Sequence, residues 1–96
     1  MKMFVIVRKD LTKSQQAVQA GHALAEYLLH GPFSRWNNGT LVYLGVKDLF
    51  HLEKLKMKLE RKGIAFVEFK EPDLNNETTA IATDKNDGLI KRLNLL

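Results

Sequence analysis

The sequence contains no cysteine, which excludes a disulfide framework, a thiol nucleophile and a cysteine-ligated zinc. Its three histidines, His22, His30 and His51, lack the spacing of metal ligands, so we expect no metal site. No apolar run is long enough to span a bilayer. The first ten residues carry no small-residue cleavage site, which favours a strand over a signal peptide. These absences predict a cytoplasmic protein without a metal, a cofactor or a membrane partner.

The chain has 96 residues, enough for one hydrophobic core and too few for two. We therefore expect residues 1–96 to form a single domain. Its net charge of +4 is unevenly placed, because residues 1–46 carry five Lys/Arg against two acids and residues 47–62 carry six against three. A basic surface favours phosphate groups, and nucleic acid is the commonest partner of that kind. A surface that merely carries extra lysines is the alternative.

Hydrophobic patterning predicts seven elements in the order β-α-β-α-β-β-α. We expect strands at residues 3–7, 40–46, 64–69 and 78–83. We expect a first helix that begins near Thr12 or Ser14, either of which can cap it, and ends near residue 30. Further helices are expected at 48–62 and after an Asp84 cap towards the apolar tail 93–96. Strands joined through helices should be parallel, whereas the short connection before the last strand allows an antiparallel pair. The prediction is an α/β domain with a mixed four-stranded sheet flanked by helices.

The first predicted helix has two contrasting sides at about 100° per residue. An arc rich in small residues is expected to face the sheet, and it comprises Ala17, Ala20, Gly21, Leu24, Tyr27 and Leu28. A polar stripe lies elsewhere on the helix and comprises Gln15, Gln19, His22 and Glu26. Arg8, Lys9 and Asp10 follow the first strand, at the sheet edge where open α/β sheets bind ligands. We expect the functional site in this region.

These patterns resemble the type II peptidyl-tRNA hydrolase family over essentially the whole chain. The resemblance rests on R-K-D-L at residues 8–11, Q-A-V-Q-A-G-H-A at 16–23, a loop with Trp36 and Gly39, E-P-D at 71–73 and T-T-A-I-A at 78–82. It implies a small α/β domain with a mixed four-stranded sheet, often dimeric. It also implies an enzyme that cleaves the ester between a peptide and the 3′ end of tRNA.

Two family segments match position by position. The family's R-x-D-L corresponds to Arg8, Asp10 and Leu11, and its Q-x-x-H-A corresponds to Gln19, His22 and Ala23. The resemblance therefore implies that these positions belong to the site.

The sequence departs from the family pattern at two places. The family has a lysine four residues before the helix glutamine, where this chain has Gln15, and Lys13 is the nearest lysine. The family's aspartate and A-G-x-T segment is shortened here to a stretch containing Glu71 and Asp73 before Thr79. Whether Glu71 or Asp73 takes the role of the family's aspartate stays open.

Ester hydrolysis needs an activated water, a stabilised oxyanion and protonation of the leaving oxygen. His22 is a candidate base because histidine titrates near neutral pH, and Asp73 is a candidate to orient or deprotonate water. Lys13, Gln15 or Gln19 would donate to the developing negative charge. No serine or cysteine triad is recognisable, so direct attack by water is the simpler model. Structural roles remain alternatives: a loop contact for His22, a turn for Asp73 and a helix surface for the glutamines.

The resemblance thus predicts a peptidyl-tRNA hydrolase that binds tRNA and forms a homodimer. A basic rim of Arg8, Lys9 and Lys13, with Lys47, would contact the acceptor stem, and Asp10 and Thr79 complete the expected binding residues. One alternative is a non-catalytic protein of the same fold that binds RNA or a protein, which the missing family lysine would explain. Another is a structural or accessory dimer without a nucleic-acid partner.

Overall fold

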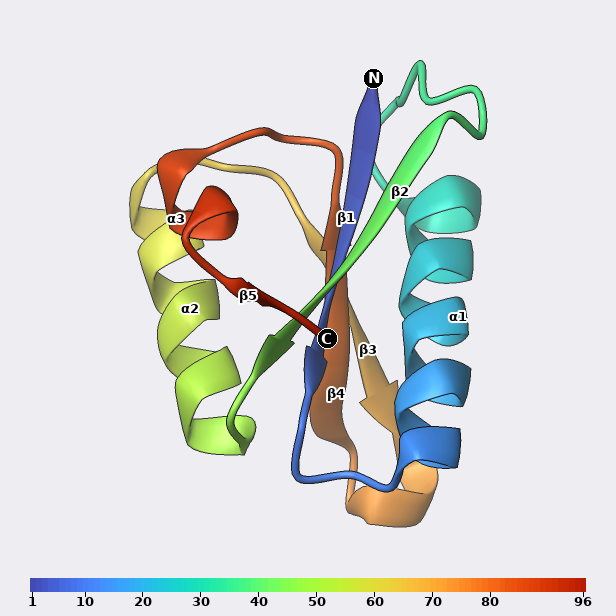
Figure 1. The fold of residues 1–96 in the computed structure, drawn as a ribbon, viewed down its shortest axis with the longest axis vertical. Coiled ribbons are helices and arrows are strands. Elements are labelled where there is room, and N and C mark those ends of the chain that lie inside the picture. The colour runs from blue at the N-terminus through green and yellow to red at the C-terminus, as the bar shows by residue number, and fades with distance from the viewer.

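The structure, a computed structural model, describes residues 1–96 and contains one five-stranded sheet with helices on both faces (Figure 1). The elements are β1 (Lys2–Arg8), α1 (Lys13–His30), β2 (Thr40–Val46), α2 (Leu49–Arg61), β3 (Val67–Glu71), the 3-10 helix η1 (Pro72–Leu74), β4 (Glu77–Thr83), α3 (Gly88–Lys91) and β5 (Asn94–Leu95). The order in the sheet is β3-β4-β1-β2-β5. None of the helices combines the length and apolar character needed to cross a membrane.

Strand β1 is the centre of the sheet. Its residues from Met3 to Arg8 are all buried, as a continuous apolar run predicts for a strand covered on both faces. It pairs in parallel with β2 through the α1 crossover and antiparallel with β4. The predicted mixed sheet is therefore confirmed.

Local signals set the ends of the two long helices. Thr12 caps α1 through a capping box, and Asp48 caps α2 by accepting the His51 N–H. After α2, Gly63 has a φ of +70°, a left-handed conformation that suits glycine. Both helices run close to the predicted bounds.

The predictions fail in three places beyond residue 63. The third strand lies at Val67–Glu71 and not at 64–69, and a short fifth strand, β5, pairs with β2. The last helix is capped by Asp87 and not by Asp84. The Asp84 carboxylate is committed elsewhere, because it is only 5 % exposed and accepts the Tyr27 hydroxyl at 2.8 Å. Strand β5 is too short to leave a periodic signal.

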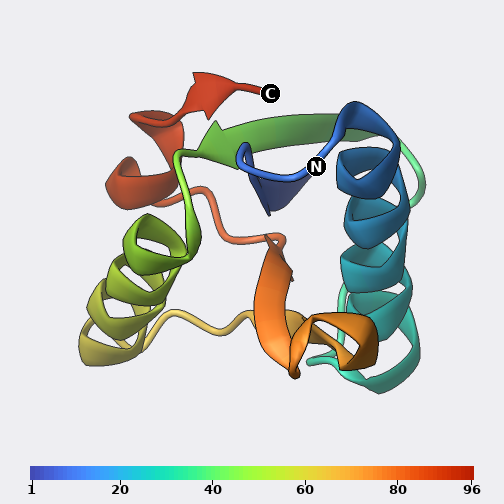
Figure 2. The same ribbon diagram turned by 90° about the horizontal axis from the view of Figure 1, so that it is seen from below.

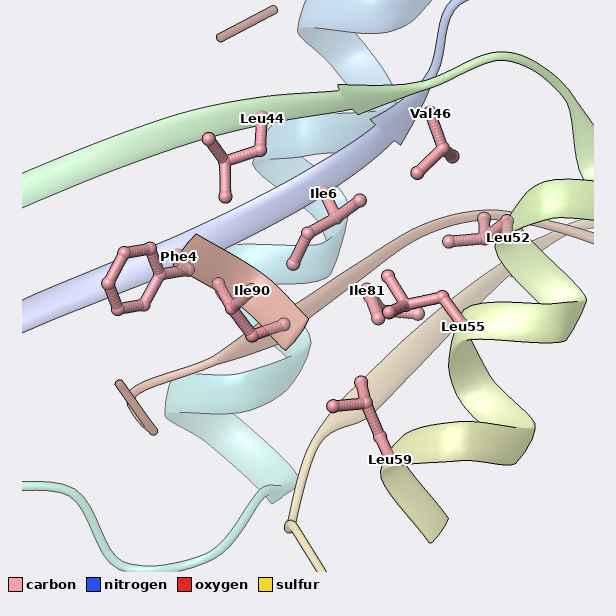
Figure 3. Packing of buried hydrophobic residues seen from close by; sticks show 9 residues of the cluster. All are labelled: Phe4, Ile6, Leu44, Val46, Leu52, Leu55, Leu59, Ile81 and Ile90. Atoms are coloured by element: carbon pink, nitrogen blue, oxygen red, sulfur yellow. The ribbon is translucent and has the colours of Figure 1, made fainter. Parts of the chain in front are cut away.

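The sheet separates two hydrophobic clusters, so the molecule has three layers (Figure 2). On the α2 face large aliphatic side chains interlock (Figure 3). That cluster comprises Phe4, Ile6, Leu44, Val46, Leu52, Leu55, Leu59, Ile81 and Ile90. On the α1 face the cluster is Met3, Val5, Val7, Ala20, Ala23, Tyr27, Ala80 and Ala82.

The buried side of α1 is rotated from the predicted arc. Gln19 and Ala23 are buried, whereas Ala17, Gly21 and Leu28 are exposed. Because alanines form much of this contact, the helix backbone lies close to the sheet. One polar side chain of the predicted stripe, that of Gln19, is thereby carried into the interface.

Candidate active site

The candidate site lies where the first half of α1 packs on β3 and β4. In Figure 1 the η1 turn lies next to the first turn of α1, and Gln19 of α1 is hydrogen-bonded to Glu71, the residue before η1. This arrangement brings the E-P-D segment next to the Q-x-x-H-A segment, as the resemblance implies. The polar side chains here come from three elements that are distant in the sequence.

Gln19 is 4 % exposed and joins the two strands through its side-chain amide. Its Nε2 donates to Glu71 Oε1 at 2.8 Å, and its Oε1 accepts the Thr79 hydroxyl at 2.6 Å. Because an ionised carboxylate only accepts hydrogen bonds, Glu71 fixes which end of the amide faces it. The second hydrogen of Nε2 has no partner within the protein.

Thr79 owes its position to an irregularity in β4. In the β3–β4 pairing Phe69 faces Ala80 and Lys70 faces Thr78, so Thr79 is the extra residue of a β-bulge. Bulges re-aim a side chain and are frequent beside active sites. Here the bulge accompanies a fully buried Thr79 whose hydroxyl reaches Gln19.

His22 lies one turn after Gln19 and stacks on a ring of β3. Its imidazole and the Phe69 ring are nearly parallel, with centroids 4.3 Å apart and an interplanar angle of 6°. Phe69 and Glu71 are two residues apart on β3. Gln19 and His22 are three residues apart on α1, so each element contributes a pair of neighbouring residues to the site. The His22 side chain is exposed and makes no hydrogen bond within the protein, so both ring nitrogens remain available to a ligand.

Arg8 does not belong to the exposed rim that the sequence predicted. Its guanidinium is buried and bonds both carboxylate oxygens of Asp10, at 3.0 and 2.7 Å, as well as Glu77 at 2.8 Å. Two parallel hydrogen bonds from one guanidinium to one carboxylate are a strong form of the arginine–carboxylate interaction. Its hydrogen bonds lower the pKa of Asp10 and raise that of Arg8. These residues brace the start of β4 against the end of β1.

A second buried network, on the opposite face, was missed by the sequence analysis. Lys56 Nζ contacts Glu68 Oε1 at 2.9 Å and the Thr78 hydroxyl at 3.1 Å. Burial works against a charged lysine, but the bonds to Glu68 and Glu53 raise the Lys56 pKa. The position of Lys56 one turn after Leu52, on the core side of α2, was the available signal.

Three predicted residues are not brought together with His22. Lys13 lies nine residues before it on α1, about 180° away around the helix axis. Gln15 is used in the capping box, where its side chain accepts the Thr12 N–H at 3.0 Å. Asp73 is exposed, and only its backbone N–H contacts the cluster, through Glu71 at 3.4 Å. Of the two candidate acids, Glu71 is the one bonded to α1.

Lys9 and Lys47 are exposed at the carboxyl ends of β1 and β2. Neither of them forms an ion pair, and the exposed Lys13 forms none either. The Lys9 side chain passes over Gly45, where a Cβ would approach within 2.6 Å of the lysine Cε. No group of three or more histidines or carboxylates is placed to hold a metal ion.

The fold and the site define a small α/β protein with a polar cluster between a helix and the adjacent strands. The chain belongs to the peptidyl-tRNA hydrolase PTH2 family, whose model matches residues 1–88. A search of curated proteins finds no match. Among solved structures, a protein of unknown function from Agrobacterium tumefaciens strain C58 is similar, with a TM-score of 0.69 and 18 % identity over 99 % of this chain and 96 % of that one. That likeness shows the fold alone.

Proposed function

We propose that this protein hydrolyses the ester between a peptide and the 3′ end of tRNA by direct attack of water. The observation that carries the proposal is the Gln19–Glu71–Thr79 cluster beside His22, in a chain of the PTH2 family. It supplies a base, an oriented amide donor and a carboxylate, which are the groups that such a hydrolysis needs.

His22 accepts the proton of the attacking water in this scheme and then donates it to the leaving ribose oxygen as the ester bond breaks. Its stack on Phe69 restricts the ring plane while leaving the nitrogens free. The second N–H of the Gln19 amide donates to the carbonyl oxygen as negative charge develops there. Glu71 and Thr79 act on Gln19, because their hydrogen bonds hold the amide in one orientation.

The acid of the site is assigned by comparing two variants. Glu71→Gln removes the carboxylate bonded to α1, whereas Asp73→Asn changes an exposed carboxylate. We expect the larger loss from Glu71→Gln. A larger loss from the folded Asp73→Asn variant would reassign the role to Asp73.

The test of the proposal is the release of N-acetylaminoacyl groups from tRNA by the purified protein. We expect His22→Ala to lower turnover by about a hundredfold or more, a loss typical of removing a catalytic base. His30→Ala is the matched control, because His30 is an exposed histidine on the same helix and contacts only Glu26. Circular dichroism checks that each variant is folded. Absence of turnover by the wild type would refute the proposal.

A non-catalytic RNA-binding protein is the second candidate, and the observation in its favour is Gln15. This residue stands where the family has a lysine and is engaged in the helix cap. Gln15→Lys discriminates the two readings: a large gain of activity in an inactive protein would favour the binding protein. No effect on an already active protein would favour the hydrolase.

In this proposal tRNA is held by the exposed cations Lys9, Lys13 and Lys47. Phosphate contacts of this kind give an affinity that falls steeply with salt and carries little sequence preference. The homodimer implied by the family would use the outward face of α1, where Val18, Leu28 and Leu29 are 54, 52 and 74 % exposed. Light scattering of the wild type and of Leu29→Glu tests that surface.

A further inference from the structure

A groove of about 310 Å³ lies between α2 and the segment around α3, away from the α1 face. Its floor is apolar and comprises Val46, Leu55, Leu89 and Leu93. Figure 3 shows Val46 of β2 and Leu55 of α2 on the two sides of the space between sheet and helix. The remaining lining residues are all basic or histidine.

The charges of this groove are of one sign. Lys54 and Lys58 stand on the α2 wall and Arg92 on the opposite wall, and no acidic residue lines the groove. All three are exposed, and none forms an ion pair. Like charges four residues apart on a helix destabilise it, so an anion bound between these cations relieves a repulsion. The groove is therefore suited to a negatively charged ligand.

The groove adjoins the end of the sheet that carries the proposed tRNA-binding lysines. Val46, which lines it, accepts the Lys9 N–H through its carbonyl at 2.8 Å. Lys47 follows directly in the chain. Figure 2 looks onto this end of the molecule, where the β1–α1 and β2–α2 connections lie between α1 and α2. Unpaired cations therefore lie both at the start of α1 and in the groove, with the partly exposed Asp10 and Asp48 carboxylates at the same end of the sheet.

We propose that this groove binds the sugar-phosphate backbone of the RNA whose 3′ end occupies the α1 site. The inference rests on the proposed function. Lys54 and Lys58 are about 6 Å apart along the helix axis, so they suit successive phosphates of one strand. The longest extent of the molecule is 31 Å, so the groove and the site lie within that distance of each other although they are on opposite faces of the sheet. A single short stem can therefore reach both the groove and the site.

A small phosphate compound fits these features less well. Small-anion sites commonly use the free N–H groups of a helix N-terminus, but on α2 the Asp48 carboxylate already accepts the His51 N–H at 3.0 Å. The groove cations are spread along a path and do not converge on one point of the backbone. The apolar floor offers packing for ribose rings and gives no further hydrogen bonds.

The test compares two triple variants that remove the same charge. Lys54→Gln/Lys58→Gln/Arg92→Gln neutralises the groove. The control is Lys2→Gln/Arg35→Gln/Arg61→Gln, which neutralises three exposed cations that form no ion pair and do not line it. Binding of deacylated tRNA is measured across a salt series. We expect the groove variant to lose at least about tenfold in affinity at low salt and to reduce the salt slope by about two; the control should lose much less.

Turnover separates the groove from the site. With N-acetylaminoacyl-tRNA we expect kcat/KM of the groove variant to fall with its affinity, and with N-acetylaminoacyl-adenosine, which has no stem, to equal that of the wild type. Equal tRNA affinity of the two triple variants would overturn the inference, as would lost turnover of the adenosine substrate. Binding of AMP or inorganic phosphate through these cations as tightly as tRNA would also overturn it. If the wild type turns over neither substrate, the proposed function fails, while the tRNA-binding comparison still decides the groove.

Discussion

The two faces of the sheet bury side chains of different size. The α2 face buries nine side chains, all of which are Leu, Ile, Val or Phe without polar atoms. The α1 face contains four alanines among its eight buried residues. Large side chains hold a helix at a distance and bury much apolar area, whereas alanines let a helix backbone approach.

This difference separates stability from positioning. Burial of a Leu or Ile side chain contributes about 1.5–3 kcal/mol, so the α2 face provides much of the folding energy. On the α1 face the close approach places the Gln19 amide within 2.8 Å of Glu71 and 2.6 Å of Thr79. We therefore expect substitutions on the α2 face to act on stability and those on the α1 face to act on the site as well.

The largest expected effect on stability comes from Leu52→Ala on the α2 face. Leu52 is fully buried, so its truncation should lower the free energy of unfolding by about 2–5 kcal/mol. Urea denaturation measures this, and activity per folded molecule should stay unchanged. Met57→Ala is the control, because Met57 on the same helix is 52 % exposed and its loss should cost less than about 0.5 kcal/mol. Equal destabilisation by both would contradict the assignment of this core.

A smaller effect is expected from overpacking the α1 face with Ala23→Leu. Ala23 is fully buried against the sheet, and extra methylenes in such a contact cost about 1–3 kcal/mol. Because α1 must shift away from β3 and β4, peptidyl-tRNA hydrolysis should fall more than the folded fraction does. Ala25→Leu, at an exposed position of the same helix, should change neither quantity. Full activity of the folded Ala23→Leu variant would argue against positioning by close packing.

Two of the three buried threonines of β4, Thr79 and Thr83, extend the comparison. The Thr79 hydroxyl donates to Gln19, and the Thr83 hydroxyl donates to the Ala65 carbonyl at 2.7 Å. Replacement of Thr79 by valine removes the bond to Gln19, whereas replacement of Thr83 removes the bond to Ala65 and also the bond that its oxygen accepts from the Lys85 N–H at 3.1 Å. Each variant should lose about 1–2 kcal/mol of stability. Only Thr79→Val should also lower kcat, because only Thr79 orients the Gln19 amide. Equal activity of the two variants would exclude that role.

The smallest effect is expected from mild acid, through the ion pairs that flank the two faces. The Arg8 hydrogen bonds hold the pKa of Asp10 below its usual 3.8. Burial raises the pKa of Glu68, but the hydrogen bonds from Lys56 and Thr78 outweigh burial and hold that pKa below its usual 4.5. A carboxylate with a lowered folded pKa stabilises the protein above the unfolded value and loses that contribution as pH falls through the folded one. Stability should thus be nearly constant from pH 7 to 5 and decline below about 4.

Both carboxylates are about a third exposed, which limits each contribution to roughly 1 kcal/mol. Urea midpoints at several pH values for Asp10→Asn and Glu68→Gln would show which face is the more sensitive to acid. A wild-type midpoint that rises between pH 5 and 3 would have the wrong sign for this explanation.

Much of the first half of the fold could be predicted from local signals. The apolar run of β1, the Asp48 cap and the β2 strand at Thr40–Val46 lie where their residues indicate, and of the two candidate caps of α1 the structure uses Thr12. The second half was predicted less well, because β3 is irregular, Asp84 is drawn away by Tyr27 and β5 pairs over only two residues.

The candidate site was predictable as a region but not as a set of contacts. The polar stripe containing Gln19 and His22 is visible in the sequence, and the family match supports its importance. The burial of Gln19 and the commitment of Arg8 to Asp10 and Glu77 were not visible, because they depend on residues far along the chain.

The sequence by itself determined the strands and helices whose hydrophobic pattern and caps are local, the basic character of the first two thirds, and membership of the family. Tertiary structure decided the rotation of α1, the choice of Glu71 over Asp73 as the partner of Gln19, and the gathering of Lys54, Lys58 and Arg92 at one groove. Gln19 and Glu71 are 52 positions apart. Such contacts arise only when packing fixes how a helix sits on its sheet, and no periodicity within a single element records that choice.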